Sequence, residues 1–251
     1  MGEDEGKQLE RIALISDIHA NLEALEAVLA DIEEQKPDAV YCLGDVVGYG
    51  PNPRECLAKV REISPVILRG NHEAAVARND DASEFNDVAQ AAVLWTRAQL
   101  GADELDFLAV LPLTCEIPER DILLVHATPG RPEKFYYLLW EVTPSEALTA
   151  FARRFCFVGH SHVPGIFVER FGRVQEMGMS VALDPGARYL VNVGSVGQPR
   201  DGNPMAAWCL VDFGKGAIKI RRVAYGLEKT QEKILAAGLP PFLASRLSIG
   251  K

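Results

Sequence analysis

The stretch Ile12-Ala-Leu-Ile-Ser-Asp-Ile-His19 decides the fold class. Its apolar part, residues 12–16, is short and ends abruptly in polar residues, as a buried strand does. Asn21 then stands where the N-cap of a helix is expected, and apolar residues recur at helical spacing until Pro37 ends the pattern. A buried strand that leads directly into an amphipathic helix is typical of an α/β sheet.

The same alternation continues through the first two thirds of the chain. Further strands are predicted for the apolar runs 38–45, 65–69, 122–125 and 155–158. Helices are predicted over 53–63, over 84–110 as a pair broken near Gly101, and over 143–154. This succession predicts parallel strands joined by crossover helices.

After residue 165 the pattern changes to short strand-like runs separated by Gly, Pro and Asp. Such runs favour antiparallel strands, which we expect to form a second sheet. The runs are 165–169, 173–176, 189–193, 206–213 and 217–222. Because no repeat or linker is present, we expect a single domain over 1–251, with a frayed tail at 1–9, a helical insertion at 84–110 and a C-terminal helical segment at 228–251.

The composition excludes several classes of protein. Of the 251 residues, 48% are apolar and 24% are charged, which argues against wholesale disorder. The formal net charge is −9, so we expect no binding of long nucleic acids or anionic membranes. No apolar run approaches the roughly 18–20 residues that span a bilayer, and the charged N-terminal sequence is unlike a signal peptide. We therefore expect a cytoplasmic protein, while the sequence leaves its oligomeric state open.

Histidine and aspartate residues gather where the predicted strands end. The carboxyl ends of parallel strands meet at one edge of a sheet, so these residues are expected to converge on one crevice. Residues two apart in an extended chain face the same way, so an Asp-x-His or His-x-His pair can point at one centre. One histidine alone would be an ordinary core or surface residue, but all five histidines of the chain follow this rule. The positions are Asp17, His19, Asp45, Asn71, His72, His126, His160 and His162.

Carboxylate, imidazole and amide groups together form a ligand set for Mn, Fe or Zn rather than for Ca or Mg. The set is larger than one ion takes. Two ions about 3.5–4 Å apart, bridged by a carboxylate, are the arrangement used for hydrolysis by in-line attack. Asp45 is the natural bridge, because it stands alone after the second strand, which we expect to be central in its sheet. The sequence therefore predicts two divalent metal ions, Mn²⁺ or Fe first, with Zn²⁺ as the alternative.

Taken in order, these residues resemble the five motif blocks of the calcineurin-like metallophosphoesterases, in particular the compact bacterial and archaeal members. The resemblance runs from residue 12 to about 165 and more loosely to about 223. It implies an α/β fold built as a four-layer α/β/β/α sandwich of two mixed β-sheets, which agrees with the change of pattern after residue 165. The blocks are Asp17-x-His19, Gly44-Asp45, Gly70-Asn71-His72-Glu73, His126 and Gly159-His160-Ser161-His162.

The resemblance also implies a role for each matching residue. His72 would be the catalytic residue that stabilises or protonates the leaving oxygen, and not a metal ligand. A hydroxide that bridges the two ions would attack phosphorus in line. The first metal ion would be bound by Asp17, His19 and His162, the second by Asn71, His126 and His160, and both by Asp45.

The second block departs from that of the protein phosphatases in the same superfamily. Those enzymes carry Gly-Asp-x-Val-Asp-Arg-Gly, whereas this chain has Gly44-Asp-Val-Val-Gly-Tyr-Gly50. Gly48 replaces the Asp that would orient the imidazole of His72, and Tyr49 replaces the Arg that would bind phosphate. These replacements argue against protein phosphatase and dinucleoside tetraphosphatase activity, and they leave His72 without an identified partner.

Substrate residues are expected in the loops around the crevice. Aromatic and basic residues in 128–140 could stack a base and hold a second phosphate. Structural alternatives are turn formation for the Gly- and Pro-rich loop 48–53, a core helix face for 128–140, and an Arg–Asp turn contact in the loop 192–201. The substrate candidates are Asn21, Tyr49, Arg131 and Arg200.

The favoured hypothesis is a two-metal phosphodiesterase that acts on a small nucleotide-like phosphate ester. The first alternative is a phosphomonoesterase, including a phosphoprotein phosphatase. The second alternative, from another class, is a metal-binding scaffold of the same fold without turnover. The complete ligand set and the presence of His72 favour an enzyme, a phosphoric ester hydrolase, over the scaffold.

Overall fold

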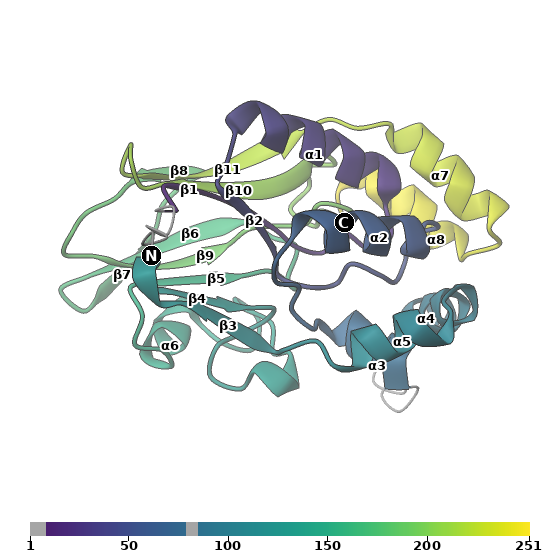
Figure 1. The fold of residues 1–251 in the computed structure, drawn as a ribbon, viewed down its shortest axis with the longest axis horizontal. Helices are drawn as coiled ribbons and strands as arrows, with labels where there is room; N and C mark the ends of the chain where they lie inside the picture. Colours follow the sequence, from purple (N-terminus) through teal and green to yellow (C-terminus); the bar gives the residue numbers. More distant parts are fainter. Residues whose placement is uncertain (1–8, 79–84) are drawn as a thin grey trace, which may run out of the picture.

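The strands form two mixed sheets that face one another (Figure 1). The computed structural model describes residues 9–78 and 85–251, so the expected frayed tail at 1–9 lies outside the described residues except for Leu9. The first sheet has the order β2-β1-β10-β11-β8 and the second has the order β3-β4-β5-β9-β6-β7. The strands are β1 Arg11–Ile15, β2 Ala39–Cys42, β3 Thr114–Ile117, β4 Ile122–Val125, β5 Phe155–Val158, β6 Gly165–Arg170, β7 Arg173–Glu176, β8 Ser180–Ala182, β9 Arg188–Asn192, β10 Ala206–Asp212 and β11 Ala217–Val223.

Each sheet contains a parallel core, as the alternation of strands and helices predicts. β1 pairs with β2 in parallel, and β5 pairs in parallel with both β4 and β9. β10 and β6 then join these cores in antiparallel orientation. The helices are α1 Leu22–Gln35, α2 Pro53–Ile63, α3 Asn71–Arg78, α4 Asp87–Gln99, α5 Ala102–Ala109, α6 Pro144–Thr149, α7 Leu227–Ala236 and α8 Pro241–Ser245.

Alternate residues of β1 serve two different cores, which explains the layered architecture. Ile12 and Leu14 belong to the core between the two sheets, whereas Ala13 and Ile15 belong to the core shared with α1 and α2. These two helices lie on the outer side of the first sheet, and α6 lies on the outer side of the second sheet (Figure 1). The predicted four-layer α/β/β/α sandwich is therefore confirmed.

The expected division of the strands between the sheets is wrong. β6, β7 and β9 do belong to the second sheet, but β10 and β11 belong to the first. β4 and β5 are in the second sheet and not beside β1. All seven residues of β10 are buried, which marks an inner strand, but nothing in its sequence selects β1 as its neighbour. Packing of the whole molecule makes that choice.

β2 is an edge strand, so the expectation that Asp45 follows a central strand is also wrong. Beyond β2 the structure has an isolated parallel bridge between Cys42 and Ile67, in place of the predicted strand at 65–69. This segment is short because Pro65 precedes it and the turn at Gly70 leads directly into α3.

The helices follow the predicted pattern with two differences. The pair expected within 84–110 is present as α4 and α5, but the helix expected over 143–154 ends at Thr149. α3 was not predicted, because residues 71–78 follow the third apolar run so closely that their helical pattern is short. β3 and β8 were not predicted either, since neither is an apolar run.

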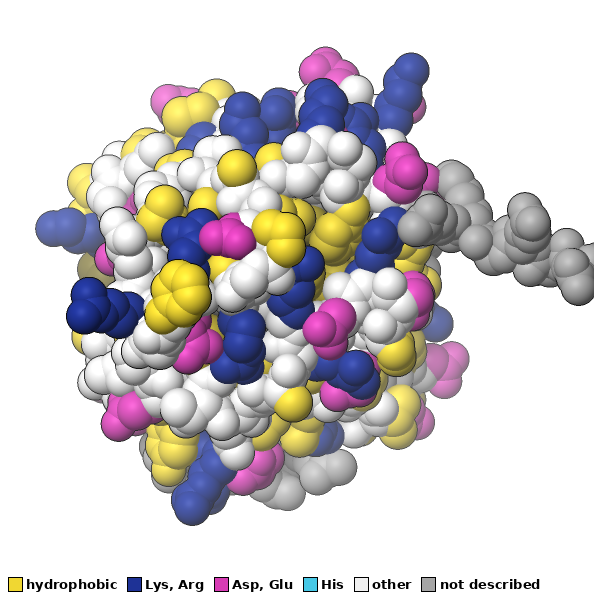
Figure 2. Space-filling model, turned by 90° about the vertical axis from the view of Figure 1, so that its left-hand side faces the viewer, with side chains coloured by type: hydrophobic (Ala, Val, Ile, Leu, Met, Phe, Trp, Pro, Cys, Tyr) yellow, Lys and Arg dark blue, Asp and Glu magenta, His cyan; other side chains and the backbone are white. Residues whose placement is uncertain are grey.

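The outer surface carries both signs of charge. Figure 2 shows the left-hand side of Figure 1, where basic and acidic side chains are interspersed and no histidine is visible. The net charge of −9 therefore does not produce a single acidic field on this face. In residues 9–78 and 85–251, no helix has both the length and the apolar character needed to cross a membrane.

Candidate metal centre

The loops that follow four strands are tied together at one side of the molecule. The amide of Asp17, after β1, donates to Gly44 O after β2 (3.0 Å), and that of Gly159, after β5, donates to His126 O after β4 (2.8 Å). The amide of His160 then donates to the Asp17 carboxylate (3.0 Å to Oδ2), which joins the two sheets. The predicted convergence of strand ends therefore occurs across two sheets instead of along one.

Most of the candidate ligands have a strained backbone. Residues with positive φ each cost about 1–3 kcal/mol, and such strain concentrates at functional sites. Asp17 and His19 do face one centre, as predicted, but His160 and His162 do not, because they belong to different donor groups. The extended backbone assumed for both pairs is also wrong. Positive φ values between 47° and 64° occur at Asp17, His19, Asp45, His160 and His162.

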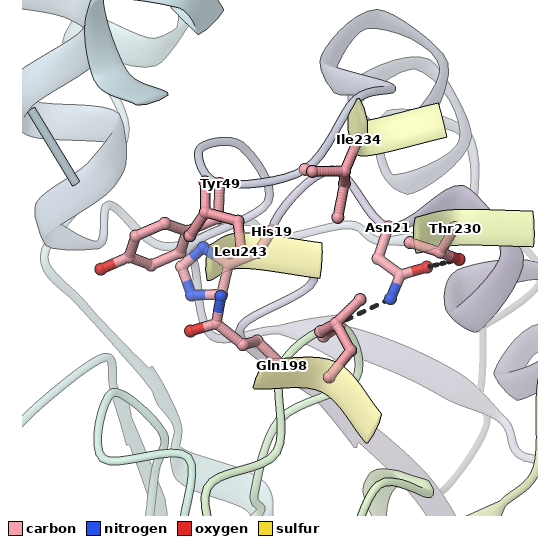
Figure 3. Close-up of a pocket in the computed structure, with 10 residues that line it drawn as sticks. His19, Asn21, Tyr49, Gln198, Thr230, Ile234 and Leu243 are labelled. Carbon is pink, nitrogen blue, oxygen red and sulfur yellow. Dashed lines mark hydrogen bonds between the residues drawn. The ribbon is translucent and has the colours of Figure 1, made fainter. Parts of the chain in front are cut away.

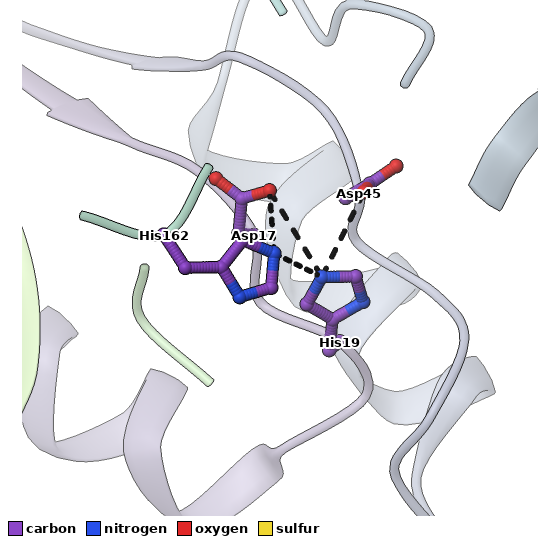
Figure 4. Close-up of side chains that lie close together, drawn as sticks. All are labelled: Asp17, His19, Asp45 and His162. Atoms are coloured by element: carbon purple, nitrogen blue, oxygen red, sulfur yellow. Dashed lines mark hydrogen bonds and ion pairs between the residues drawn. The ribbon is translucent and has the colours of Figure 1, made fainter. Parts of the chain in front are cut away.

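Four buried side chains form the first group of possible ligands (Figure 4). The Nε2 atoms of His19 and His162 lie 3.0 Å apart. Asp17 Oδ1 lies 3.3 Å from His162 Nε2 and 3.9 Å from His19 Nε2. Asp45 Oδ2 completes the group at 3.7 Å from His19 Nε2. Donor atoms at this separation can all reach one cation.

Asp45 also belongs to a second group, together with His126 and His160. Its Oδ2 lies 3.4 Å from His126 Nε2. Its Oδ1 accepts a hydrogen bond from the amide of His72, at the N-terminus of α3 (3.0 Å). Asn71, the first residue of α3, immediately precedes that amide. Asp45 thus lies between two donor groups, which is the bridging position expected of it.

The second group contains buried donor atoms that are unsatisfied. His126 Nε2, His160 Nε2 and Asn71 Oδ1 have no hydrogen-bond partner among the described residues. Buried polar atoms without partners are rare and usually mark a bound water, an ion or a functional strain. Here all three atoms come from residues that were selected as ligands from the sequence. This agreement shows that the donor set fits a metal ion.

Backbone carbonyl groups fix the tautomers of three of these histidines. The Nδ1 atoms of His19, His126 and His162 lie 3.2, 2.8 and 2.6 Å from the carbonyl oxygens of Val47, Leu43 and Gln198. A ring that donates from Nδ1 presents the Nε2 lone pair, as metal-binding histidines do. The facing Nε2 atoms of His19 and His162 would then repel each other unless a cation or a proton lies between them. A divalent ion satisfies both.

Burial and charge set the protonation of the cluster. Burial lowers the pKa of His160 to about 3 and that of His19 well below its usual value. Burial opposes ionisation of Asp45, but the surrounding imidazoles, His126 foremost, hold the pKa of Asp45 well below its usual range. Burial also disfavours the charged ring of His126, yet the facing Asp45 carboxylate raises the pKa of His126 to about 9. The cluster therefore presents ionised carboxylates and mostly neutral rings, which are the metal-binding forms.

His72 is held by rings and not by a carboxylate. Its ring centre lies 4.4 Å from that of Tyr49, 4.7 Å from that of His19 and 5.0 Å from that of Phe85. A Cβ atom on Gly48 would lie 2.2 Å from His72 Nδ1, so an Asp side chain cannot occupy this position. Nδ1 is buried without a partner among the described residues. The missing orienting partner of His72 is thus replaced by aromatic packing.

The four substrate candidates have different surroundings in the structure. Tyr49 is half-buried beside His19 and His72, and the Arg200 guanidinium lies 5.9 Å from its ring centre. The expected alternative of an Arg–Asp turn contact does not form, because Asp201 pairs with Arg222. Arg200 instead donates to Gln198 Oε1 from Nε and Nη2. Tyr49 and Arg200 therefore lie next to the cluster.

The contacts of Asn21 and Arg131 do not indicate a role in binding substrate. Asn21 Oδ1 accepts from the amide of Ala24 as the predicted N-cap and from the hydroxyl of Thr230 in α7, while its Nδ2 donates to Gly197 O (Figure 3). Its amide therefore joins three parts of the protein, in a pocket that His19 and Tyr49 also line. Arg131 is exposed and lines a separate pocket away from the donor groups.

Glu73 is a site residue to which the sequence analysis gave no role. It is fully buried and accepts hydrogen bonds from the amides of Asp45 and Val46 (2.7 Å each) and of Gly70 (2.9 Å). Burial and the nearby Asp45 charge raise the pKa of Glu73 to about 7. Glu73 thus shapes the loop that carries Asp45. Its position directly after Asn71-His72 was the signal that could have identified it.

Two further contacts support the cluster from the second sheet. Ser195, after β9, donates to Asp17 O (2.7 Å), and Asn192 Nδ2 donates to Gly159 O (2.8 Å).

Tyr137 stacks on His160 with ring centres 4.0 Å apart, and Trp140 meets Tyr137 edge to face at 5.6 Å. The segment 128–140 was singled out for its aromatic residues, but only the structure shows that Tyr137 reaches the donor groups.

Comparison with known proteins agrees with this geometry. Residues 11–216 match the family model of the calcineurin-like phosphoesterase superfamily domain. An uncharacterized protein of Methanocaldococcus jannaschii is 40% identical over 243 residues, which cover 96% of this chain and 98% of that protein. The crystal structure of a metallophosphoesterase from Sphaerobacter thermophilus is 38% identical, with a TM-score of 0.80, and the match covers 96% of this chain and 99% of that one.

A more distant similarity is confined to part of the chain. The symmetrical bis(5′-nucleosyl)-tetraphosphatase of Shewanella sediminis is 28% identical over 117 residues. The match covers 45% of this chain and 42% of that enzyme. It shows a related segment in an enzyme that is named for a nucleotide substrate.

Proposed function

Because this chain belongs to the calcineurin-like phosphoesterase superfamily, we propose that it is a metal-dependent phosphodiesterase acting on a small nucleotide-like ester. The observation that carries the proposal is a pair of buried donor groups that share Asp45. Several of their nitrogen and oxygen atoms have no partner among the described residues. Buried polar atoms of this kind are costly unless a ligand satisfies them, and these donors suit cations.

Two ions are proposed, because the donors divide into two groups. Bound divalent ions supply Lewis acidity: they lower the pKa of water and offset the charge on phosphoryl oxygens. The chain contributes preorganisation, since carbonyl groups orient the imidazoles and Glu73 shapes the Asp45 loop. The first group is Asp17, His19 and His162, the second is Asn71, His126 and His160, and Asp45 serves both.

His72 is proposed to contact the leaving oxygen of the substrate. Its Nδ1 faces Gly48, which leaves Nε2 as the nitrogen available to a substrate. Burial lowers the pKa of His72 to about 4, and the Arg200 charge adds to this, while Asp45 opposes it. A bound anionic phosphate would stabilise the protonated ring and so favour proton donation.

Two observations support a diester over a monoester, and a third supports a nucleotide-like ester. Tyr49 stands where protein phosphatases have a phosphate-binding Arg, so one cation suited to a dianionic phosphate is missing. Tyr49, Tyr137 and Trp140 offer aromatic faces to an organic group on the far side of phosphorus. The distant relative from Shewanella is named for a nucleotide substrate, which supports a nucleotide-like ester.

The test compares aryl mono- and diesters. Metal-stripped protein is reloaded with Mn²⁺, its metal content is measured, and hydrolysis of bis(nitrophenyl) phosphate and of nitrophenyl phosphate is followed at neutral and alkaline pH. We expect a higher kcat/KM for the diester. A panel of cyclic nucleotides and dinucleoside polyphosphates then narrows the substrate class.

The alternatives give different results in the same assay. A preference for the monoester would identify a phosphomonoesterase or phosphoprotein phosphatase. Protein that binds two equivalents of metal and hydrolyses neither ester would be the non-catalytic scaffold. Either outcome would contradict the phosphodiesterase proposal.

A further inference from the structure

Two arginines near the cluster donate to amide or main-chain oxygens and, among the described residues, not to an Asp or Glu side chain. Arg200 Nε and Nη2 both donate to the amide oxygen of Gln198 (3.3 and 2.8 Å). Arg246 begins a 3-10 turn at Arg246–Ile249, and its Nε donates to the main-chain oxygen of Lys251. Within residues 9–78 and 85–251, no Asp or Glu side chain forms an ion pair with either guanidinium. Other half-buried guanidinium groups in this protein do have such a partner, as Arg222 has in Asp201.

The C-terminal turn is docked on the loop that carries Arg200. The amide of Gly202 donates to Gly250 O (2.9 Å), and Gly250 fits so closely against Asn203 that a Cβ atom would lie 2.6 Å from its backbone nitrogen. This docking fixes Arg246 on the same side of the molecule as Arg200. Their association is therefore part of the fold, not a chance approach of flexible side chains.

Tyr49 neighbours both arginines. The Arg200 guanidinium is 5.9 Å from the Tyr49 ring centre. Arg246 and Tyr49 line the same open pocket of about 310 Å³, and its other lining residues are Asn86, Asp87, Val88 and Phe242. Since Tyr49 also packs on His72 at 4.4 Å, the pocket opens beside the leaving-group side of the proposed site.

The two arginines are held by different parts of the fold. Arg200 is tied directly to the cluster, because its amide donates to His162 O (3.1 Å). Arg246 belongs to the C-terminal turn and lines the open pocket beside Tyr49. Burial and the charge of Arg200 lower the pKa of Arg246 to about 10. Two neighbouring cations repel each other, and an anion bound between them would relieve this repulsion.

We propose that Arg246, with Tyr49, binds a second phosphate group of the substrate, while Arg200 faces the phosphate that is hydrolysed. The inference rests on the proposed phosphodiesterase function and names the substrate class: a nucleotide-like diester that carries a further phosphate. A guanidinium can hold a phosphate through two parallel hydrogen bonds, and a tyrosine hydroxyl can donate a third.

The test uses two substrates that differ by one phosphate. Both are nitrophenyl esters of a nucleoside 5′-phosphate, and one also carries a 3′-phosphate. For the Mn²⁺-loaded wild type, we expect a lower KM for the 3′-phosphorylated ester. Arg246→Gln should raise that KM roughly tenfold and leave the other ester unchanged, because a charge-assisted contact is lost. Arg200→Gln should lower kcat/KM for both esters.

Two further variants separate charge from structure. Arg246→Lys should restore part of the lost affinity, since it keeps the charge without the planar fork. Arg173→Gln, which removes an exposed cation on β7, should behave as the wild type. Equal KM values for the two esters in the wild type, or an equal effect of Arg246→Gln on both, would overturn the inference.

A binding measurement keeps this inference distinct from the proposed function. If the metal-loaded protein hydrolyses neither ester, the phosphodiesterase proposal fails. Calorimetric titration with pyrophosphate then tests the anion site without turnover. Weaker binding to Arg246→Gln than to the wild type and Arg173→Gln would support the site, whereas equal binding to all three proteins would refute it.

Discussion

At the residue scale, His72 shows how close packing replaces a missing side chain. Its ring is surrounded by Tyr49, His19 and Phe85, and its Nδ1 lies against Gly48. A carboxylate at position 48 would orient His72 through a hydrogen bond, whereas here the ring is fixed by its neighbours. Gly48, which stands where the protein phosphatases have Asp, is therefore required by the position of His72.

Replacing His72 separates catalysis from metal binding. His72→Ala removes the proposed contact with the leaving oxygen and leaves the two donor groups intact, so we expect bound metal to be retained and kcat to fall about 10²–10⁴-fold. The measurements are metal content and turnover of the diester. His162→Ala is the matched comparison and should lose metal as well as activity. Unchanged turnover in His72→Ala would remove this residue from the mechanism.

Gly48 is a second residue-scale test. Its φ of 87° disfavours any side chain, and a Cβ atom would lie 2.2 Å from His72 Nδ1. Gly48→Ala should therefore displace His72, lower kcat and destabilise the fold by about 1–2 kcal/mol. Gly178→Ala is the control, because a Cβ atom there meets nothing within 4 Å. Equal activity of the two variants in the diester assay would show that His72 tolerates displacement.

At the element scale, α1 is attached to the first sheet by one carboxylate. Asp31 accepts hydrogen bonds from Trp208 Nε1 in β10 (2.8 Å) and from Arg221 Nε and Nη2 in β11 (2.7 Å each). The Arg221 guanidinium, helped by Trp208, lowers the pKa of Asp31 below its usual value of 3.8. Because α1 begins directly after the His19 loop, this attachment also steadies the first motif block.

The stability that Asp31 provides should depend on pH. A lowered pKa in the folded protein means that the contribution is fully present above about pH 3.8, the usual value of the group, and is lost as pH falls through the lower folded value. Asp31→Asn should lower the free energy of unfolding by about 1–2 kcal/mol at neutral pH. Urea unfolding of both proteins should show this difference shrinking below pH 3.8.

Glu62→Gln is the control for this measurement, because Glu62 is exposed on α2 and forms no ion pair among the described residues. It should match the wild type at neutral pH. A difference between wild type and Asp31→Asn that stays constant down to strongly acidic pH would show that the carboxylate charge is not the source of the stabilisation.

At the scale of the whole molecule, the site joins the two sheets. Asp17 and Asp45 follow strands of the first sheet, and His126, His160 and His162 follow strands of the second. A metal ion bound by both sets would bind the folded state and not the unfolded chain. Metal binding should therefore stabilise the sandwich as a whole.

Metal removal tests this coupling. A ligand present at about 100 times its Kd adds about 2.7 kcal/mol to the stability of the folded state. We therefore expect Mn²⁺ to raise the Tm of stripped protein by several degrees. Asp45→Asn should lose most of this rise, while Asp103→Asn, on the exposed side of α5, should keep it. An identical Tm with and without Mn²⁺ in the wild type would contradict a shared metal site.

The sequence by itself determined the fold class and the chemistry of the site. Both depend on local features: apolar runs that end in polar residues, and ligand types placed at those ends. Polar residues at the ends of apolar runs sufficed to select Asp17, His19, Asp45 and their partners, although His72 lies in α3 and the strand ends meet across two sheets. Glu73 lay within the same motif, but its role depends on amides that only the folded loop brings to it.

Only the tertiary structure decided which strand lies in which sheet and which distant residues complete the site. β10 pairs with β1 although Arg11 and Asp212, which face each other across these strands, lie 201 residues apart. Arg246 reaches the neighbourhood of Arg200 through docking of a C-terminal turn. The physical reason is the same in both cases. Such contacts are selected by the packing of the complete molecule, and no local pattern of residue types encodes that packing.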